Sequence, residues 1–417
     1  MNELFQQVRI LDPLSQSDRL ADILICDSKI EAIAPQLTQY PSDSQITPPS
    51  GYILAPGLVD LYSQSSDPGH EDRETLDQLA QAALAGGFTH ITLLPNTTPP
   101  LDTAATCQFL QQKAQTLPKK PQFHYWGAIT RHLAGEQLAE LDDLRQNGVI
   151  GWSDGKTLAH WGLLRRALEY AQPWQKPLAL GLTHPQLQEQ GVMREGPLSI
   201  QMGLVGDPAY SESATLAALL EIIAAFSTPV HLMRVSTARS VELIAQAKGK
   251  GLSITASTPW HHLLLDTSAL MDYDPNLRLD PPLGNSTDRL ALQEGVKTGV
   301  IDAIAIDHTP YSYEEKTVAF AEAPPGALGL QLALPLLWQH LIRQGDWTPL
   351  QLWNALSTAP HRCLQQPPLE CTPGTQGGFI LFDPQAPWTV DSTTLHSACQ
   401  NTYWWGKTLQ GKVLRVW

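Results

Sequence analysis

The feature that most constrains the fold of this sequence is a regular alternation of short apolar segments with segments of helical spacing. Strands buried on both faces read as continuous apolar or β-branched runs. Eight such runs span residues 57–64, 90–96, 122–130, 148–154, 177–183, 229–236, 253–258 and 302–307. Residues 74–87, 163–172, 213–226, 240–251 and 288–299, which lie between them, repeat apolar side chains at three- and four-residue steps. The pattern predicts an α/β protein with a (β/α)8 TIM barrel. A doubly wound sheet is the alternative, but no GxGxxG motif follows the first strand to favour it.

The two ends of the chain have a different pattern from the middle. The N-terminal stretch ADILICDSKIEAIAP indicates strand, turn and strand, and the C-terminal stretches GGFILFDPQAPWTV and TYWWGKTLQGKVLRVW indicate further short strands. We therefore expect a small β-domain built from both termini. The predicted boundaries are 1–55 and 366–417 for the two parts of this domain, and 56–365 for the barrel.

Charge and cysteine content restrict the classes of partner and compartment. The net charge of −14 argues against binding to nucleic acid or to anionic membranes. No apolar run approaches the roughly 18 residues of a membrane span, and the first residues do not resemble a signal peptide. The five cysteines are odd in number and have no CxxC spacing, which is typical of reduced thiols in the cytosol. We expect a cytoplasmic protein.

Candidate functional residues are those at the carboxyl ends of the barrel strands, where such barrels carry their active sites. Alternate residues of a strand share a face, so Asp60, Tyr62 and Gln64 are expected to point inward together. The same count places Arg234 inward and His231 outward. The other strand ends carry Asn96, Ser153, Asp154, Gly181, Asp307 and His308. His261 and His262 follow the seventh strand, where we expect an ordinary loop, with a place at a pocket mouth as the alternative.

A long, ordered set of motifs resembles the dihydroorotases of the amidohydrolase superfamily. The motifs are APGLVDLYSQSSDPGHED, GGFTHITLLPNTTPPLD, GVMREGPLSIQMGL, VHLMRVSTARSVELI, LDPPLGNSTDRLAL, IDAIAIDHTPYSYEEK and APPGALGLQLALPL. The resemblance covers nearly the whole chain and implies an amidohydrolase-like barrel. It also implies the family's activity, which is closure of carbamoyl aspartate to dihydroorotate on a zinc-type metal site in pyrimidine synthesis.

The residues that the resemblance assigns to the metal are largely replaced in this chain. The family's metal positions correspond to Tyr62, Gln64, Ser153 or Asp154, Gly181, Arg234 and Asp307, of which Asp307 is the one clearly kept. Among the implied substrate contacts, Asn96 is kept, whereas Ser66, Asp280, Gly284 and Tyr311 differ from the family residues. Asn96 is read either as a substrate contact or as a turn residue.

A zinc ion is not expected at such a site. Catalytic zinc takes three or more His, Asp or Cys ligands, and glycine offers no ligand atom. An arginine stays protonated, so it does not coordinate a metal and its charge repels one. We therefore predict no metal and no other cofactor, and an ion pair between Arg234 and Asp307 in place of the metal. In this reading Asp307 and Asp154 are structural carboxylates left over from the family site.

Three functions are weighed on this basis. The first is a non-catalytic pseudo-dihydroorotase, which the resemblance links to aspartate carbamoyltransferase as its partner. The second is an active dihydroorotase or related cyclic amidohydrolase with a rearranged site. The third is a regulatory protein that binds a pyrimidine precursor. A homo-oligomer is left open.

Overall fold

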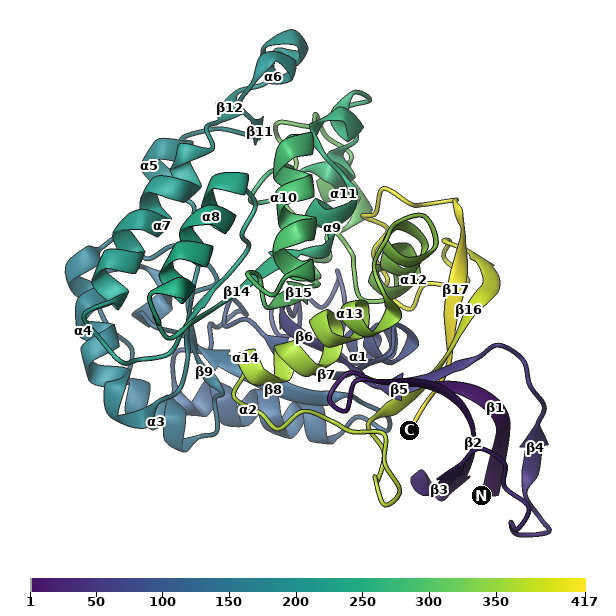
Figure 1. The fold of residues 1–417 in the computed structure, drawn as a ribbon. Helices are drawn as coiled ribbons and strands as arrows, with labels where there is room; N and C mark the ends of the chain where they lie inside the picture. Colours follow the sequence, from purple (N-terminus) through teal and green to yellow (C-terminus); the bar gives the residue numbers. More distant parts are fainter. Residues whose placement is uncertain (1) are drawn as a thin grey trace.

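The computed structural model describes residues 2–417, and its centre is an eight-stranded parallel sheet rolled into a nearly closed barrel (Figure 1). Every strand predicted for the barrel is present, although most are shorter than their apolar runs. The strands are β6 (Leu58–Ser63), β7 (Phe88–Leu93), β8 (Gln122–Gly127), β9 (Gly151–Ser153), β10 (Leu178–Leu180), β13 (Val230–Leu232), β14 (Ile254–Pro259) and β15 (Ala303–Ala305). Their order in the sheet follows the chain from β6 to β15.

The seam between β6 and β15 is closed by a buried carboxylate as well as by backbone. The Asp60 carboxylate accepts hydrogen bonds from the Ile306 amide at 2.9 Å and from the Ser63 hydroxyl at 2.5 Å. Beyond the strand ends, the Asp307 amide donates to the Tyr62 carbonyl and the Gln64 amide donates to the His308 carbonyl. Burial raises the pKa of Asp60 to about 7, an effect that its two hydrogen bonds oppose. The Asp60 side chain therefore stabilises the junction between β6 and β15.

Helices cover the outside of the barrel, as the alternating pattern predicts (Figure 1). Apolar side chains of the helices and of the outward strand faces form one continuous core. The helices on the barrel are α1 (Leu76–Ala85), α2 (Ala104–Gln115), α3 (Leu141–Gln146), α4 (Trp161–Ala171), α7 (Tyr210–Ile223), α8 (Ala238–Gly249) and α10 (Ser286–Lys297). Shorter helices are α5 (Pro185–Gln188), α6 (Pro197–Met202), α9 (Trp260–Leu264), α11 (Tyr313–Lys316), α12 (Ala333–Leu337), α13 (Pro349–Trp353) and α14 (Ala359–Cys363). Strands β11 (Met193–Arg194) and β12 (Gly206–Asp207) form a separate two-stranded pair that supports α6.

The second sheet contains strands from both ends of the chain. Its seven strands are β1 (Asn2–Asp12), β2 (Ser17–Cys26), β3 (Lys29–Ala34), β4 (Gln45–Thr47), β5 (Ile53–Pro56), β16 (Phe379–Thr389) and β17 (Thr408–Val416). Strand β5 pairs with β1 on one side and with β16 on the other, so it joins the two termini. The predicted fold class, a (β/α)8 barrel with a small β-domain from both termini, is confirmed. No helix among residues 2–417 is long and apolar enough to cross a membrane.

Candidate functional site

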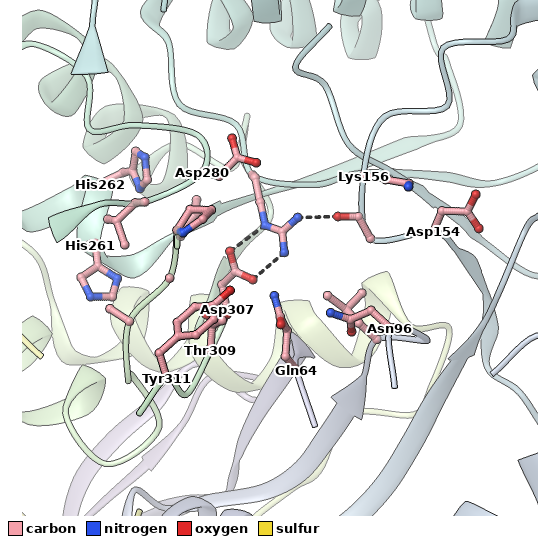
Figure 2. A pocket seen from close by; sticks show the side chains of 18 of the residues that line it. Gln64, Asn96, Asp154, Lys156, His261, His262, Asp280, Asp307, Thr309 and Tyr311 are labelled. Carbon is pink, nitrogen blue, oxygen red and sulfur yellow. Dashed lines mark hydrogen bonds and ion pairs between the residues drawn. The ribbon is translucent and has the colours of Figure 1, made fainter. Parts of the chain in front are cut away.

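A cavity of about 260 Å³, lined by both polar and apolar side chains, lies at the carboxyl ends of the barrel strands. Nine of the residues singled out from the sequence line it: Gln64, Asn96, Asp154, Arg234, His261, His262, Asp280, Asp307 and Tyr311. The rest of the lining comes mainly from the loops that follow the strands, and is formed by Leu94, Leu133, Gly155, Lys156, Pro259, Leu279, Thr309, Pro325, Gly326 and Ala327. Figure 2 shows Asp307 between Tyr311 and Gln64, with dashed lines for the two hydrogen bonds that its carboxylate accepts from Arg234.

The centre of the cavity is a two-point ion pair between Arg234 and Asp307. The Arg234 Nε and Nη2 atoms lie 2.6 and 2.7 Å from the two Asp307 carboxylate oxygens, and Nη1 donates to the Gly155 carbonyl at 2.6 Å (Figure 2). The two side chains are 14% and 15% exposed. Burial alone would lower the pKa of the Arg234 guanidinium, but the Asp307 carboxylate more than offsets this, so that pKa lies above its ordinary value. The predicted ion pair is therefore confirmed.

Both partners of this ion pair have a backbone conformation that side chains disfavour. The φ angles are 55° at Arg234 and 52° at Asp307, in the left-handed region where non-glycine residues are uncommon. Such strain costs of order 1–3 kcal/mol per residue, and it persists where surrounding contacts impose it. The bidentate contact thus joins two strained segments that follow β13 and β15, two strands separated in the sheet by β14 alone.

Tyr62 lies beneath Arg234 and belongs to a chain of hydrogen bonds inside the barrel. Its hydroxyl accepts from the Arg234 amide at 3.0 Å and is 3.0 Å from the Ser257 hydroxyl. The Ser257 hydroxyl is 2.8 Å from Nε2 of His231, whose Nδ1 is 2.9 Å from the Thr255 hydroxyl. Burial, and to a lesser degree the Asp307 charge, raise the pKa of Tyr62 above its usual value, so the phenol stays protonated.

The prediction that His231 points out of the barrel is wrong. Its ring bonds to the inward hydroxyls of β14 and lies 6.4 Å, centre to centre, from the Tyr62 ring. Leu232 instead packs in the core between the barrel and its helices. The expected alternation assumed that the strand continues to Arg234, but β13 ends at Leu232 and the left-handed conformation of Arg234 resets the direction of its side chain.

Asp154, a second carboxylate of the site, holds a neighbouring loop through three hydrogen bonds. One oxygen accepts from the Ile129 and Thr130 amides at 2.8 and 3.0 Å, and the other accepts from the Thr130 hydroxyl at 2.5 Å. Burial raises the pKa of Asp154, an effect that the Thr130 and Ile129 hydrogen bonds oppose. Both of its oxygens thus accept from protein donors, which agrees with the predicted structural role.

Gly181 lies where the backbone of another loop fills the space beside β10. A Cβ atom placed on Gly181 would meet the Lys156 carbonyl carbon at 2.7 Å and the Thr157 amide nitrogen at 2.8 Å. The same loop supplies the Gly155 carbonyl that binds Arg234. The loss of a side chain at 181 and the presence of arginine at 234 are therefore linked through one loop.

Restoring a histidine at Gly181 is expected to destabilise the protein. Because the contacts are with backbone, the loop around Lys156 must move, and the cost of such overpacking is roughly 1–3 kcal/mol. Urea unfolding of Gly181→His should show this loss. The matched control is Gly249→His, since a Cβ at Gly249 has open space around it. Equal stability of Gly181→His and wild type would contradict the packing described here.

The residues present do not fit the zinc that the resemblance implies. Of the six metal positions, Gly181 has no ligand atom and no room for one, and Arg234 places a guanidinium on the Asp307 carboxylate. The Tyr62 hydroxyl and the Asp154 carboxylate are bonded to protein groups. Among residues 2–417, no group of three or more His, Cys, Asp or Glu side chains is arranged to hold a metal ion.

Several lining residues were not favoured for the cavity by the sequence. For His261 and His262 an ordinary loop is the favoured expectation and a pocket mouth the alternative; they lie on α9 and line the cavity, as in the alternative, and both are buried. Their position directly after a strand end, in the stretch STPWHHLLL, was the available signal. Lys156 lines the opposite side (Figure 2). Asn96, predicted as a substrate contact or turn residue, lines the cavity and is exposed.

Comparisons with known proteins find relatives along nearly the whole chain. Residues 51–240 match a family model described as dihydro-orotase-like. The chain is 48% identical over 436 residues to a probable dihydroorotase-like protein of Synechocystis sp., with 98% of each chain covered. It is 35% identical over 412 residues to a dihydroorotase of Pelotomaculum thermopropionicum, covering 99% of this chain and 96% of the relative.

A solved structure extends the likeness at the level of the fold. The L-hydantoinase of Arthrobacter aurescens superimposes with a TM-score of 0.84 at 20% identity, covering 100% of this chain and 94% of the hydantoinase. At that identity the likeness concerns the fold alone. The identity and coverage of the sequence relatives, together with the barrel and the position of the site, show that the chain belongs to the dihydroorotase-like family of the amidohydrolase superfamily.

Proposed function

We propose that this chain is a pseudo-dihydroorotase of pyrimidine biosynthesis, which supports aspartate carbamoyltransferase and does not itself catalyse the metal-dependent reaction. The observation that carries the proposal is the Arg234–Asp307 ion pair at the centre of the cavity. A fixed positive charge there opposes a divalent cation, and the carboxylate that would ligate it is already neutralised. A mechanism through zinc-bound water therefore has no place in this site.

The partner role rests on the resemblance and on what the chain keeps. The barrel, its helices and the two-terminus sheet are complete, whereas the groups for metal chemistry are replaced. Most substitutions destabilise a fold whose margin is only about 5–15 kcal/mol, so a fold without any role would not be expected to persist. Binding of a partner protein to its surface would explain why the complete fold is kept. The resemblance implies that this partner is aspartate carbamoyltransferase.

Co-expression with the aspartate carbamoyltransferase of the same organism tests the partner role. We expect one complex on size exclusion, with an interface of at least about 1,000 Å². The carbamoyltransferase should be less active or less assembled when the chain is absent. Separate elution at micromolar concentration, with equal carbamoyltransferase activity alone and in the mixture, would refute this role.

Catalytic silence is expected even when two ligand positions are restored. The wild type and the double variant Tyr62→His, Gln64→His should not interconvert carbamoyl aspartate and dihydroorotate in the presence of zinc, because Arg234 and Gly181 still prevent a complete site. The dihydroorotase of Pelotomaculum thermopropionicum serves as the active control. Turnover that follows the wild-type protein through two different columns would favour the active cyclic amidohydrolase instead.

A second function, the binding of a pyrimidine precursor as a regulatory ligand, is favoured by one polar atom. His262 Nε2 lies 3.1 Å from the Pro281 carbonyl and must donate to it, which leaves Nδ1 as a buried acceptor without a partner. Burial, together with the Arg194 charge, lowers the pKa of His262 to about 4, so the ring is neutral. An N–H group of a cyclic amide would satisfy this atom once the His262 ring turns it toward the cavity that it lines. A rise in melting temperature with dihydroorotate that is lost in His262→Phe would support this function.

A further inference from the structure

The chain has an arm that projects from the barrel and does not line the cavity at its tip. The arm consists of residues 189–207, with the paired strands β11 and β12 as its stem and α6 at its tip, and Figure 1 shows it standing clear of the barrel. Its inner side chains Val192, Met193 and Met202 share a small core with Leu270 and Leu277. The Tyr273 hydroxyl also donates to the Met202 carbonyl at 2.8 Å. Residues 267–277 therefore support the arm, and the two segments form one packed unit.

The outer surface of the arm and its support is unusually apolar. Ile200 is 80% exposed at the tip, Val205 is 55% exposed on the stem, and Met271 and Tyr273 of the support are 49% and 43% exposed. Single exposed apolar residues are ordinary on protein surfaces. Four large ones on one anchored projection are typical of a surface that another protein covers, since contact cores are enriched in aromatic residues and methionine.

The exposed charged side chains of the arm and its support all carry a negative charge. Glu189, Glu195 and Asp272 are exposed and Asp274 is half-buried, while Arg194 is the only base within residues 189–207 and 267–277. Arg194 is buried in an ion pair with Asp207 and adds nothing to the surface. Two bases lie beside the support but are not exposed: Arg278 is half-buried and donates to the Leu279 carbonyl, and the buried Lys316 ammonium donates to the Pro275 carbonyl. The exposed charges that accompany the apolar side chains of the arm and its support are therefore all acidic.

This charge pattern discriminates between classes of partner. A second copy docked through the same face would set acid against acid, which costs binding free energy. Nucleic acid and anionic lipid surfaces carry the same unfavourable charge. A protein with an apolar socket surrounded by Lys and Arg side chains is complementary in both respects.

We propose that the arm, residues 189–207 with its support 267–277, is the docking surface for a protein partner of that chemistry. This inference rests on the proposed function, under which the partner is aspartate carbamoyltransferase. Ile200 enters the apolar socket, and Glu189, Glu195 and Asp272 face its basic rim. The acids act mainly on the rate of association, and the apolar centre on the lifetime of the complex.

The experiment measures the affinity of the purified chain for the aspartate carbamoyltransferase of the same organism by surface plasmon resonance at low and high salt. Ile200→Asp is expected to weaken binding at least about tenfold. Glu195→Lys is expected to slow association and to flatten its salt dependence. Matched controls are Leu20→Asp, on an exposed residue of β2, and Glu169→Lys, on exposed α4, both of which should bind like wild type. The Ile200 side chain is mostly in solvent, so its variant should keep the wild-type melting temperature.

The outcomes separate this inference from the proposed function. If wild type binds and Ile200→Asp binds equally well, the arm is not the docking surface, and the pseudo-dihydroorotase role stands. If wild type does not bind, both the partner role and the arm's occupant are refuted. If Ile200→Asp instead dissociates a homo-oligomer in analytical ultracentrifugation while the carbamoyltransferase affinity is unchanged, the occupant is a second copy and the inference is overturned.

Discussion

Replacing Arg234 with methionine is expected to lower the free energy of unfolding at neutral pH by about 3–5 kcal/mol. Methionine keeps much of the side-chain length but leaves the Asp307 carboxylate without the two hydrogen bonds that neutralise it. The pair is 14–15% exposed, so the loss should fall toward the lower end of that range. The Gly155 carbonyl would also lose its donor. Urea unfolding followed by circular dichroism measures this loss.

The control for this prediction is an arginine pair on the surface. Arg239 pairs with Glu242 on α8, but both side chains are more than half exposed, so Arg239→Met should change stability by less than about 0.5 kcal/mol. The double variant Arg234→Met, Asp307→Leu should recover part of the loss, because it removes both charges. If Arg234→Met unfolds at the wild-type urea concentration, the ion pair is not a structural replacement for a metal.

The second large effect is expected at Asp154. In Asp154→Ala, the Ile129 and Thr130 amides lose their buried acceptor and the Thr130 hydroxyl loses its own, at a cost of roughly 3–5 kcal/mol in the free energy of unfolding. This follows from counting buried donors left without a partner, since each costs about 1–3 kcal/mol. The same urea experiment applies.

Asp154→Asn separates the structural role of this residue from a chemical one. The amide oxygen can still accept from both backbone amides, so most of the stability should be retained. If Asp154 were instead a ligand or a general base, alanine and asparagine would both leave stability nearly unchanged, and any activity would be lost in both. A wild-type unfolding curve for Asp154→Ala would contradict the loop-holding role.

The fold could be predicted from the sequence because its signal is repeated along the chain. Each barrel strand is a short apolar run between stretches of helical spacing, and every one of these runs contains a strand. The two-terminus sheet was recognised from its different, turn-rich pattern. The carboxyl ends of the strands then indicated where the cavity would lie.

The details that were missed depend on backbone that leaves the regular pattern. His231 was placed on the wrong face because the left-handed Arg234 breaks the alternation of β13. His261 and His262 lie on a short helix, α9, and line the cavity. The alternation of side chains along a strand does not predict the direction of a helix that follows it. The contact between Gly181 and the backbone at Lys156 joins segments that are distant in the sequence, so no local sequence pattern predicts it. The Arg234–Asp307 pair was predictable because opposite charges were expected at neighbouring strand ends of one barrel mouth.

The central claim, that an arginine–aspartate pair stands where the family holds its metal, is tested most directly by zinc binding. Purified wild-type protein is dialysed to equilibrium against micromolar zinc, and the metal is measured by elemental analysis. The dihydroorotase of Pelotomaculum thermopropionicum serves as the positive control, and Asp307→Asn reports whether any zinc is held in the cavity. We predict well under one zinc per chain, with no difference between wild type and Asp307→Asn. One zinc per wild-type chain that is lost in Asp307→Asn would contradict the claim.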